Sequence, residues 1–170
     1  RSSDLNTITI SASPVLTNAA VDFGAAFGPA RRLVVRPATR LARATIANSN
    51  PGVPVVSMMV AGNVTLQDLD LLRNITNNHN ILEMSNCADI VIERCRIGSN
   101  WPVPGLAGWS NVTIAYPTNV TLRNNILFAH ALGTFDLGID AANFNDPANA
   151  LRLYNNVVAD YRLFGVRIQA

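Results

Sequence analysis

The stretch Ile81-Leu-Glu-Met-Ser-Asn-Cys-Ala-Asp-Ile-Val-Ile-Glu-Arg-Cys-Arg-Ile97 decides the fold of this chain. In its second half, the inward apolar positions Ile90 and Ile92 are two residues apart, and the phase slips at Glu93 and Arg94. The alternation then resumes at Cys95. Alternation predicts a strand with one face buried. The slip predicts a bend that redirects the chain while the same face stays inward.

This pattern recurs through most of the chain. Four segments share it, with starts 26, 30 and 31 residues apart: Asn63–Leu71, Asp89–Ile97, Asn119–Leu127 and Ala150–Val158. Shorter strands are predicted at the same interval at Ser57–Val60, Ile81–Met84, Val112–Ile114, Leu137–Asp140 and Gly165–Ile168. Apolar residues at helical spacing are absent from these segments. Repeats of this length indicate coils of a β-solenoid, an all-β fold of about five to six coils.

Aligning the repeats predicts which residues stack. The inward columns before the bend are Val64, Ile90, Val120 and Leu151, followed by Leu66, Ile92, Leu122 and Leu153. The columns after the bend are Leu69, Cys95, Asn125 and Asn156, followed by Leu71, Ile97, Leu127 and Val158. Members of a column are expected at about 4.8 Å, the spacing of paired strands. Asn125 and Asn156 are expected to form an amide ladder, and Cys95 to act as a small buried hydrophobe.

These repeats resemble those of right-handed parallel β-helix proteins, the pectate-lyase-like superfamily. The resemblance covers about Val55 to Ala170. Residues 1–54 are less regular, with strands expected at Leu5–Ser11 and Leu33–Pro37, and helix is expected at most near Ala19–Phe27. We expect residues 1–170 to form one right-handed parallel β-helix domain, or a fragment of a longer one.

The resemblance implies a place of action rather than an activity. Members of this superfamily are mostly polysaccharide lyases and hydrolases, tailspikes, adhesins and passenger domains that work outside the cell. An extracellular or cell-surface location is therefore expected. The Gly-His-Gly segment of the hydrolases is absent, since His79 and His130 lie in other contexts, and the Lys–Arg pair of the alginate-type lyases requires a lysine that this chain lacks. Neither catalytic set can be transferred.

Strand alternation suggests one constellation of titratable residues. The outward column of the shorter strands is predicted to contain Met59, Glu83, Thr113, Asp140 and Arg167. Glu83, Asp140 and Arg167 are the catalytic candidates, with the two carboxylates about 10 Å apart by strand spacing, slightly wide for an inverting pair. The alternative is a cross-strand ion pair between Asp140 and Arg167. No cofactor is expected; a calcium ion would have only the scattered Asp136, Asp140 and Asp146 as ligands.

Two longer loops carry aromatic residues. Trp101 and Trp109 belong to one and Phe144 to the other, and these side chains are candidates for stacking on sugar rings. They could equally fold down onto a coil edge. Asn-x-Thr triplets at Asn63, Asn74, Asn111 and Asn119 match glycosylation acceptors. Repeat strands open at Asn63 and Asn119, so repeat chemistry also explains those two triplets.

Composition narrows the range of partners. The net charge of +2 is small, and all thirteen basic residues are arginines. They concentrate at Arg31, Arg32, Arg36, Arg40 and Arg43 without interleaved aromatic residues. A nucleic-acid partner is therefore not expected; the cluster is either a solvated face or a site for acidic sugars. No apolar run reaches the length of a membrane span, and two cysteines form no metal-ligand pattern.

Three functions remain open on this evidence. The first is an extracellular scaffold, adhesin or fibre segment, and the second is a polysaccharide lyase or glycoside hydrolase domain. The third is a carbohydrate-binding module, whose partner would be a polysaccharide or a cell-surface glycan. Because Gly165–Ile168 begins a further coil, we expect end-to-end self-association or continuation in a longer chain.

Overall fold

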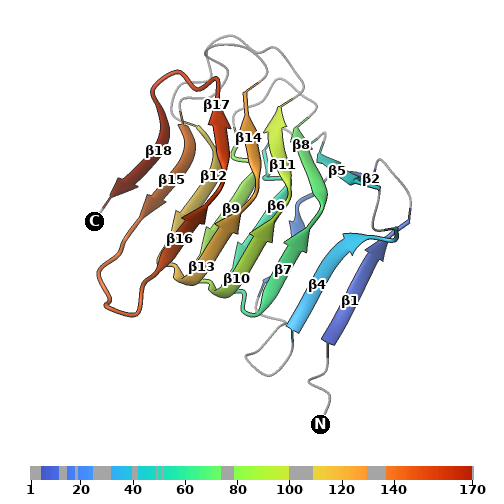
Figure 1. Cartoon of the computed structure of the whole chain (residues 1–170), viewed down its shortest axis with the longest axis horizontal. Coiled ribbons are helices and arrows are strands. Elements are labelled where there is room, and N and C mark those ends of the chain that lie inside the picture. Colours follow the sequence, from blue (N-terminus) through green and yellow to red (C-terminus); the bar gives the residue numbers. More distant parts are fainter. Residues whose placement is uncertain are drawn as a thin grey trace.

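The chain forms a parallel β-solenoid of about five turns (Figure 1). The computed structural model describes residues 5–11, 15–17, 19–24, 32–39, 42–48, 50, 52–73, 79–99, 109–129 and 137–169. Within these ranges all regular structure is strand, and helix is absent. The all-β solenoid expected from the repeats is thus confirmed.

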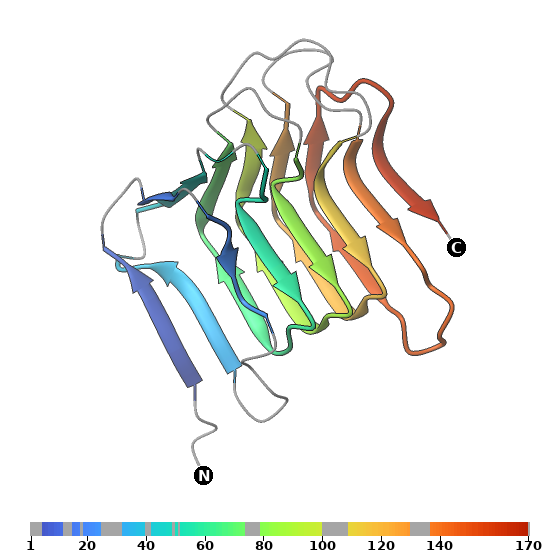
Figure 2. The ribbon, with the colours of Figure 1, turned by 180° about the vertical axis from the view of Figure 1, so that it is seen from behind.

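Three six-stranded parallel sheets make up the solenoid, one strand of each per coil (Figures 1 and 2). Sheet A contains β1 (Leu5–Ile10), β4 (Arg32–Pro37), β7 (Val64–Gln67), β10 (Ala88–Glu93), β13 (Thr118–Arg123) and β16 (Leu151–Tyr154). Sheet B contains β2 (Val15–Thr17), β5 (Ala44–Asn48), β8 (Leu69–Arg73), β11 (Arg96–Ser99), β14 (Ile126–Phe128) and β17 (Val157–Ala159). Sheet C contains β3 (Val21–Asp22), β6 (Val56–Met59), β9 (Leu82–Ser85), β12 (Ser110–Ala115), β15 (Leu137–Ala142) and β18 (Phe164–Gln169).

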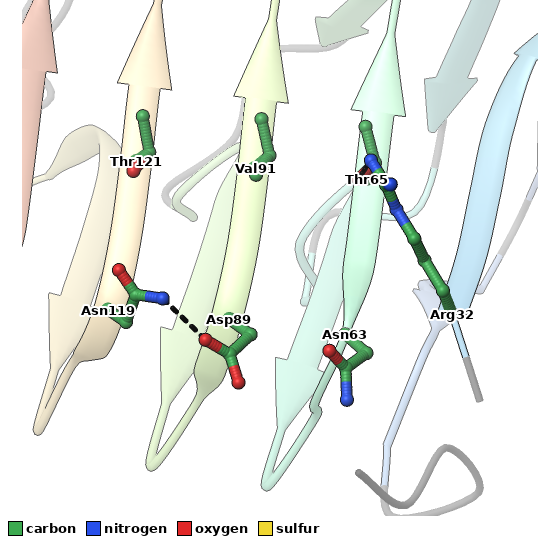
Figure 3. A pocket seen from close by; sticks show the side chains of 7 residues that line it. All are labelled: Arg32, Asn63, Thr65, Asp89, Val91, Asn119 and Thr121. Atoms are coloured by element: carbon green, nitrogen blue, oxygen red, sulfur yellow. Dashed lines mark hydrogen bonds between the residues drawn. The ribbon is translucent and has the colours of Figure 1, made fainter. Parts of the chain in front are cut away.

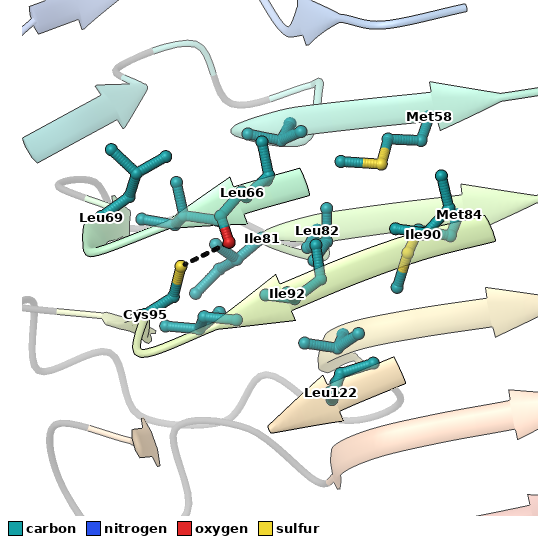
Figure 4. Packing of buried hydrophobic residues seen from close by; sticks show 14 of the residues in the cluster. Met58, Leu66, Leu69, Ile81, Leu82, Met84, Ile90, Ile92, Cys95 and Leu122 are labelled. Atoms are coloured by element: carbon teal, nitrogen blue, oxygen red, sulfur yellow. Dashed lines mark hydrogen bonds between the residues drawn. The ribbon is translucent and has the colours of Figure 1, made fainter. Parts of the chain in front are cut away.

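The predicted columns are the observed register. Ile92 pairs with Leu66 on one side and Leu122 on the other, and Ile97 pairs with Leu71 and Leu127. In the central coils these side chains are fully buried and pack into one continuous apolar core (Figure 4). Each coil therefore depends on the coils before and after it to bury its apolar face, as expected of a solenoid.

Cys95 is part of this core, as the alternation predicted. Its Sγ lies 3.6 Å from the carbonyl oxygen of Leu66, and burial raises the pKa of its thiol to about 12. Cys87 is also buried, and burial raises the pKa of its thiol too. Both cysteines are free and serve as small core residues.

The turns between sheets repeat an unusual backbone conformation. At the bend from sheet A to sheet B, Asp68, Arg94, Asn124 and Asn155 have φ between 49° and 57°. At the start of the sheet A strands, Asn63, Asp89 and Asn119 have φ between 54° and 58°. Asn and Asp tolerate this left-handed region better than other non-glycine residues. The many asparagines of the sequence therefore turn the chain at equivalent points of successive coils.

An asparagine ladder stabilises the bend from inside. Asn125 Oδ1 accepts a hydrogen bond from the Cys95 amide at 2.9 Å, and Asn125 Nδ2 donates to the carbonyl oxygen of Ile92 at 2.9 Å. Asn156 repeats these contacts one coil later: its Oδ1 accepts from the Asn125 amide at 3.0 Å, and its Nδ2 donates to Leu122 O at 2.9 Å. The predicted ladder is confirmed, and it satisfies backbone groups that the bend leaves without a sheet partner.

The less regular first part of the chain contributes strands to the same three sheets. The predicted strands at Leu5–Ser11 and Leu33–Pro37 correspond to β1 and β4. The sequence allowed at most one short helix, near Ala19–Phe27; residues 19–24 contain none, and Val21–Asp22 form β3, which pairs with β6, while residues 25–27 lie outside the described ranges. Parallel pairing with the next coil outweighs the local preference of this small-residue stretch. In the described part of the chain, no helix is long and apolar enough to cross a membrane.

Replacing Ile92 with aspartate should abolish folding. Ile92 is fully buried between Leu66 and Leu122, so Ile92→Asp puts a carboxylate among aliphatic side chains, at a cost of more than about 4 kcal/mol. Val91→Asp is the matched control, because Val91 points outward from the same strand and should lose about 1 kcal/mol. Urea denaturation followed by circular dichroism measures both. Similar midpoints for the two variants would show that the inward assignment is wrong.

Candidate functional site

The outward column of sheet C contains the predicted catalytic candidates. Register places Glu83 beside Thr113, Thr113 beside Asp140, and Asp140 beside Arg167. The prediction that Met59 opens this column is wrong: Ser57 pairs with Glu83, and Met59 pairs with Ser85. Strand β6 begins at Val56, which pairs with Leu82. The observed register therefore differs from the predicted one by one pleat, or two residues, and the same face of β6 stays exposed.

Asp140 is held in an ion pair with Arg167. The guanidinium donates two hydrogen bonds to the carboxylate, from Nε to Oδ1 at 2.9 Å and from Nη2 to Oδ2 at 2.7 Å. Gln169 Nε2 donates a third, to Oδ1 at 3.0 Å. The hydrogen bonds from Arg167 lower the pKa of Asp140 below its usual range. Asp140 is therefore a stabilised anion, as in the ion-pair interpretation of this column.

Glu83 has different neighbours. Asn80 Nδ2 donates to Glu83 Oε1 at 2.7 Å, while Asn80 Oδ1 accepts from the Ser110 amide at 3.0 Å. His79 Nδ1 lies 3.2 Å from the same Glu83 oxygen, an ion-pair distance without hydrogen-bond geometry. The ring of Trp109 stacks on His79, with centroids 5.4 Å apart. His79 and Asn80 were not singled out from the sequence, although the spacing of His79 and Glu83 was visible.

The column does not bring the two carboxylates together. Glu83 and Asp140 lie two coils apart with Thr113 between them, and each is bound to its own partners. A retaining or inverting pair needs one carboxyl group as acid and the other as nucleophile or base. Glu83 beside His79 is a single acid–base pair, and Asp140 is engaged by Arg167.

The aromatic candidates lie against the coils. Trp109 and Phe144 are partly buried and pack on the hydrophobic core. This is the alternative in which loop aromatics fold down onto the solenoid instead of standing free in solvent. Trp101 lies outside the described residues.

The scattered aspartates form no calcium cage in the described ranges. Asp140 is engaged by Arg167, and Asp146 Oδ1 accepts a hydrogen bond from the Ala148 amide at 2.8 Å. Asp136 lies outside the described residues. Asp146 is the single carboxylate lining an open hollow of about 340 Å³ with Asn86, Tyr116, Thr118, Asn145 and Asn149. No group of three or more His, Cys, Asp or Glu side chains is placed to hold a metal ion among the residues described.

The glycosylation triplets differ in accessibility. Asn111 is fully buried, and its Nδ2 donates to the carbonyl oxygens of Ile97 and Phe128 and to Tyr161 Oη. In the folded chain it offers no free amide. Asn119 is exposed and exchanges side-chain hydrogen bonds with Asp89 and Arg152. Asn63 is half-buried, and Asn74 lies outside the described residues.

The outer face of sheet A carries a shallow polar hollow of about 260 Å³ (Figure 3). It is lined by Arg32, Asn63, Thr65, Asp89, Val91, Asn119 and Thr121. Arg32 crosses toward Thr65, and Asn119 contacts Asp89, so these side chains bind one another across coils. The sequence had marked Asn63 and Asn119 as glycosylation triplets and Arg32 as part of the arginine cluster, but it did not indicate that they share one hollow.

Arg73 is a buried cation that the sequence did not mark either. Its Nη2 donates to the carbonyl oxygens of Val53 at 2.8 Å and Asn80 at 3.0 Å. Burial lowers the pKa of its guanidinium to about 10. The side chain thus fastens backbone segments on either side of β8 and leaves Nε and Nη1 without acceptors.

Comparison with known proteins identifies no relative. The chain matches no protein-family model, no curated protein and no solved structure.

The Asp140–Arg167 pair should make stability depend on pH in acid. Because the pKa of Asp140 is lowered in the folded chain, its contribution is present above the unfolded value and is lost as pH falls through the folded one. At neutral pH, Asp140→Asn should lose less than about 1 kcal/mol, since Arg167 is partly exposed. This difference should fade below about pH 4.

Urea denaturation from neutral pH into acid measures this difference. Arg167→Gln should show the same pH dependence, and Thr113→Ala, in the same column, should show none. A deficit of Asp140→Asn that persists unchanged into strong acid would contradict the ion pair.

Proposed function

We propose that this chain is a structural module of an extended β-solenoid, an extracellular scaffold or fibre segment whose coils stack on further coils. The observation that carries this proposal is the solvent exposure of the apolar residues that β18 adds to the inward columns. Ile139 and Ala141 are fully buried, whereas their partners on β18, Val166 and Ile168, are 40% and 62% exposed. A further coil stacked on β18 would bury these apolar side chains and pair with the free edge of the parallel sheet.

Charge along sheet C supports stacking of this kind. Asp22 on β3 pairs with Ser57, and Ser57 with Glu83, so Asp22 stands in the same outward column as Arg167. If β3 of a second copy continued sheet C in register, Asp22 of that copy would lie beside Arg167. A cross-strand ion pair would then favour the register that also joins the apolar columns.

The outer surface is occupied by contacts between coils. Ion pairs join Asp68 to Arg94 at 2.8 Å, Asp70 to Arg43 at 2.7 Å and Glu93 to Arg123 at 2.5 Å. Every described Asp or Glu other than Asp160 accepts a hydrogen bond or ion pair from the protein. Most of these carboxylates bind a side chain of a neighbouring coil and so stabilise the stack of coils, which favours the scaffold over a polysaccharide lyase or hydrolase.

The expected location follows from the same role. Superfamily members that the repeats resemble work outside the cell as adhesins, fibres and polysaccharide-active proteins, and we propose an extracellular or surface location for this chain. In this proposal a glycan is a surface that the module contacts, and not a substrate. If the chain were an enzyme, Glu83 beside His79 would be the candidate catalytic pair.

End-to-end association is the direct test of the module. Size-exclusion chromatography with light scattering should show mass rising with concentration. Ile168→Asp should reduce this association at least about tenfold, because it places a charge on the stacking face. Tyr154→Asp is the matched control: Tyr154 is 54% exposed in the same coil but points outward, and it should leave association unchanged.

Two results would contradict the proposal. The first is a monomer at every concentration. The second is depolymerisation of a polysaccharide by the wild-type chain that is lost in Glu83→Gln, which would assign the site to an enzyme.

A further inference from the structure

On the outer face of sheet A, one column of register neighbours contains both an ion pair and a cation with no acid beside it. Glu93 and Arg123 are register partners and form an ion pair, with Arg123 Nε 2.7 Å from Glu93 Oε2. One coil before Glu93 the column holds Gln67. Arg36 follows Val35, the register partner of Leu66, and so stands beside Gln67. Arg36 therefore stands beside an amide and not beside an acid.

Arg36 is also the arginine for which the described structure provides no acceptor. Its Nε is shielded from solvent and donates no hydrogen bond. The other described arginines have partners: Arg32, Arg43, Arg73, Arg94, Arg96, Arg123, Arg152, Arg162 and Arg167. A guanidinium presents five N–H donors in a planar fork, so Arg36 keeps unused capacity for an anion.

The space beside Arg36 is open. Arg36, Gln67, Asp68 and Arg94 line a hollow of about 600 Å³ at the corner of sheets A and B. The one acid in it is neutralised, because Arg94 donates to both Asp68 oxygens at 2.8 and 3.0 Å. Gln67 Nε2 donates to Asp68 Oδ2 at 3.1 Å. The lining thus carries one uncompensated positive charge, that of Arg36.

We propose that this hollow binds an oxyanion, a sulfate or phosphate group held by the guanidinium of Arg36. Arginine binds such groups through two parallel charge-assisted hydrogen bonds. Arg94 adds little to the attraction, because its Nη1 lies 3.4 Å from Glu93 Oε1. The ligand is either a free inorganic ion or a sulfate or phosphate ester on a polymer, and its site on sheet A is independent of the stacking ends.

Binding is measured by titrating the Nε–H resonance of Arg36 in nitrogen–proton spectra and by calorimetry at low ionic strength. The probes are sodium sulfate, sodium phosphate, dextran sulfate and neutral dextran, each against chloride of equal ionic strength. Sulfate or phosphate should shift the resonance and chloride should not. Binding of the inorganic ions identifies a free ion as sufficient, whereas binding of dextran sulfate alone identifies a group on a polymer; both outcomes support the site.

Three variants separate this site from general attraction to a basic face. Arg36→Gln should weaken binding by about tenfold or more, the loss of a charge-assisted bidentate contact. Arg36→Lys keeps the charge but loses the fork and should bind with intermediate strength. Arg152→Gln removes an equal charge from an exposed arginine of the same sheet that is bound to Asn119, and it should bind as wild type does. Equal losses in Arg36→Gln and Arg152→Gln, or no binding beyond that of chloride, would overturn the proposal.

Discussion

The whole structure depends on the stacking of aliphatic side chains along columns, one coil above another at the spacing of hydrogen-bonded strands. No single coil encloses enough apolar surface to be stable, because its inward side chains meet only a few partners in their own plane. Ile92 is fully buried because Leu66 and Leu122 continue its column in both directions. The bends between sheets and the ion pairs between coils keep these columns in register.

The bends keep the columns in register. Where a strand of sheet A gives way to sheet B, the chain must turn without exchanging its inward and outward faces. A residue with positive φ makes the turn, and Asn125 and Asn156 bind the backbone groups that the turn frees. Outside, ion pairs between coils replace the stacking that apolar side chains provide inside. Individually they contribute little, but each one disfavours a slip by one pleat, which would separate the paired charges.

The repeats made the coil architecture, the inward columns and the asparagine ladder predictable, because these features repeat with a period that the sequence displays directly. Errors arose where local signals are weak. Met59 was assigned one pleat away from its true position because alternation alone does not show where a strand begins; β6 begins at Val56, which pairs with Leu82. The short helix that the sequence allowed near Ala19–Phe27 does not form at residues 19–24, where β3 pairs with β6 over a long sequence distance.

The candidate sites were harder to predict for a physical reason. The Asp140–Arg167 pair was expected as one of two alternatives, since neighbours in register follow from the repeat alone. His79 and Asn80 precede β9, and their contacts with Glu83 depend on side-chain conformation that no period encodes. The unmatched Arg36 lay within the reach of sequence reasoning, since Val35 and Leu66 share a column and Gln67 follows Leu66.

Residue-resolved amide hydrogen exchange tests most directly the claim that stacking between coils holds the chain together. The central strands β7, β10 and β13 have neighbours on both sides, whereas β16 and β18 have a described neighbour on one side only. If column stacking is the source of stability, the amides of β7, β10 and β13 exchange slowest, and exchange quickens through β16 and β18. Equal protection in all coils, or fastest exchange in β10, would contradict this account.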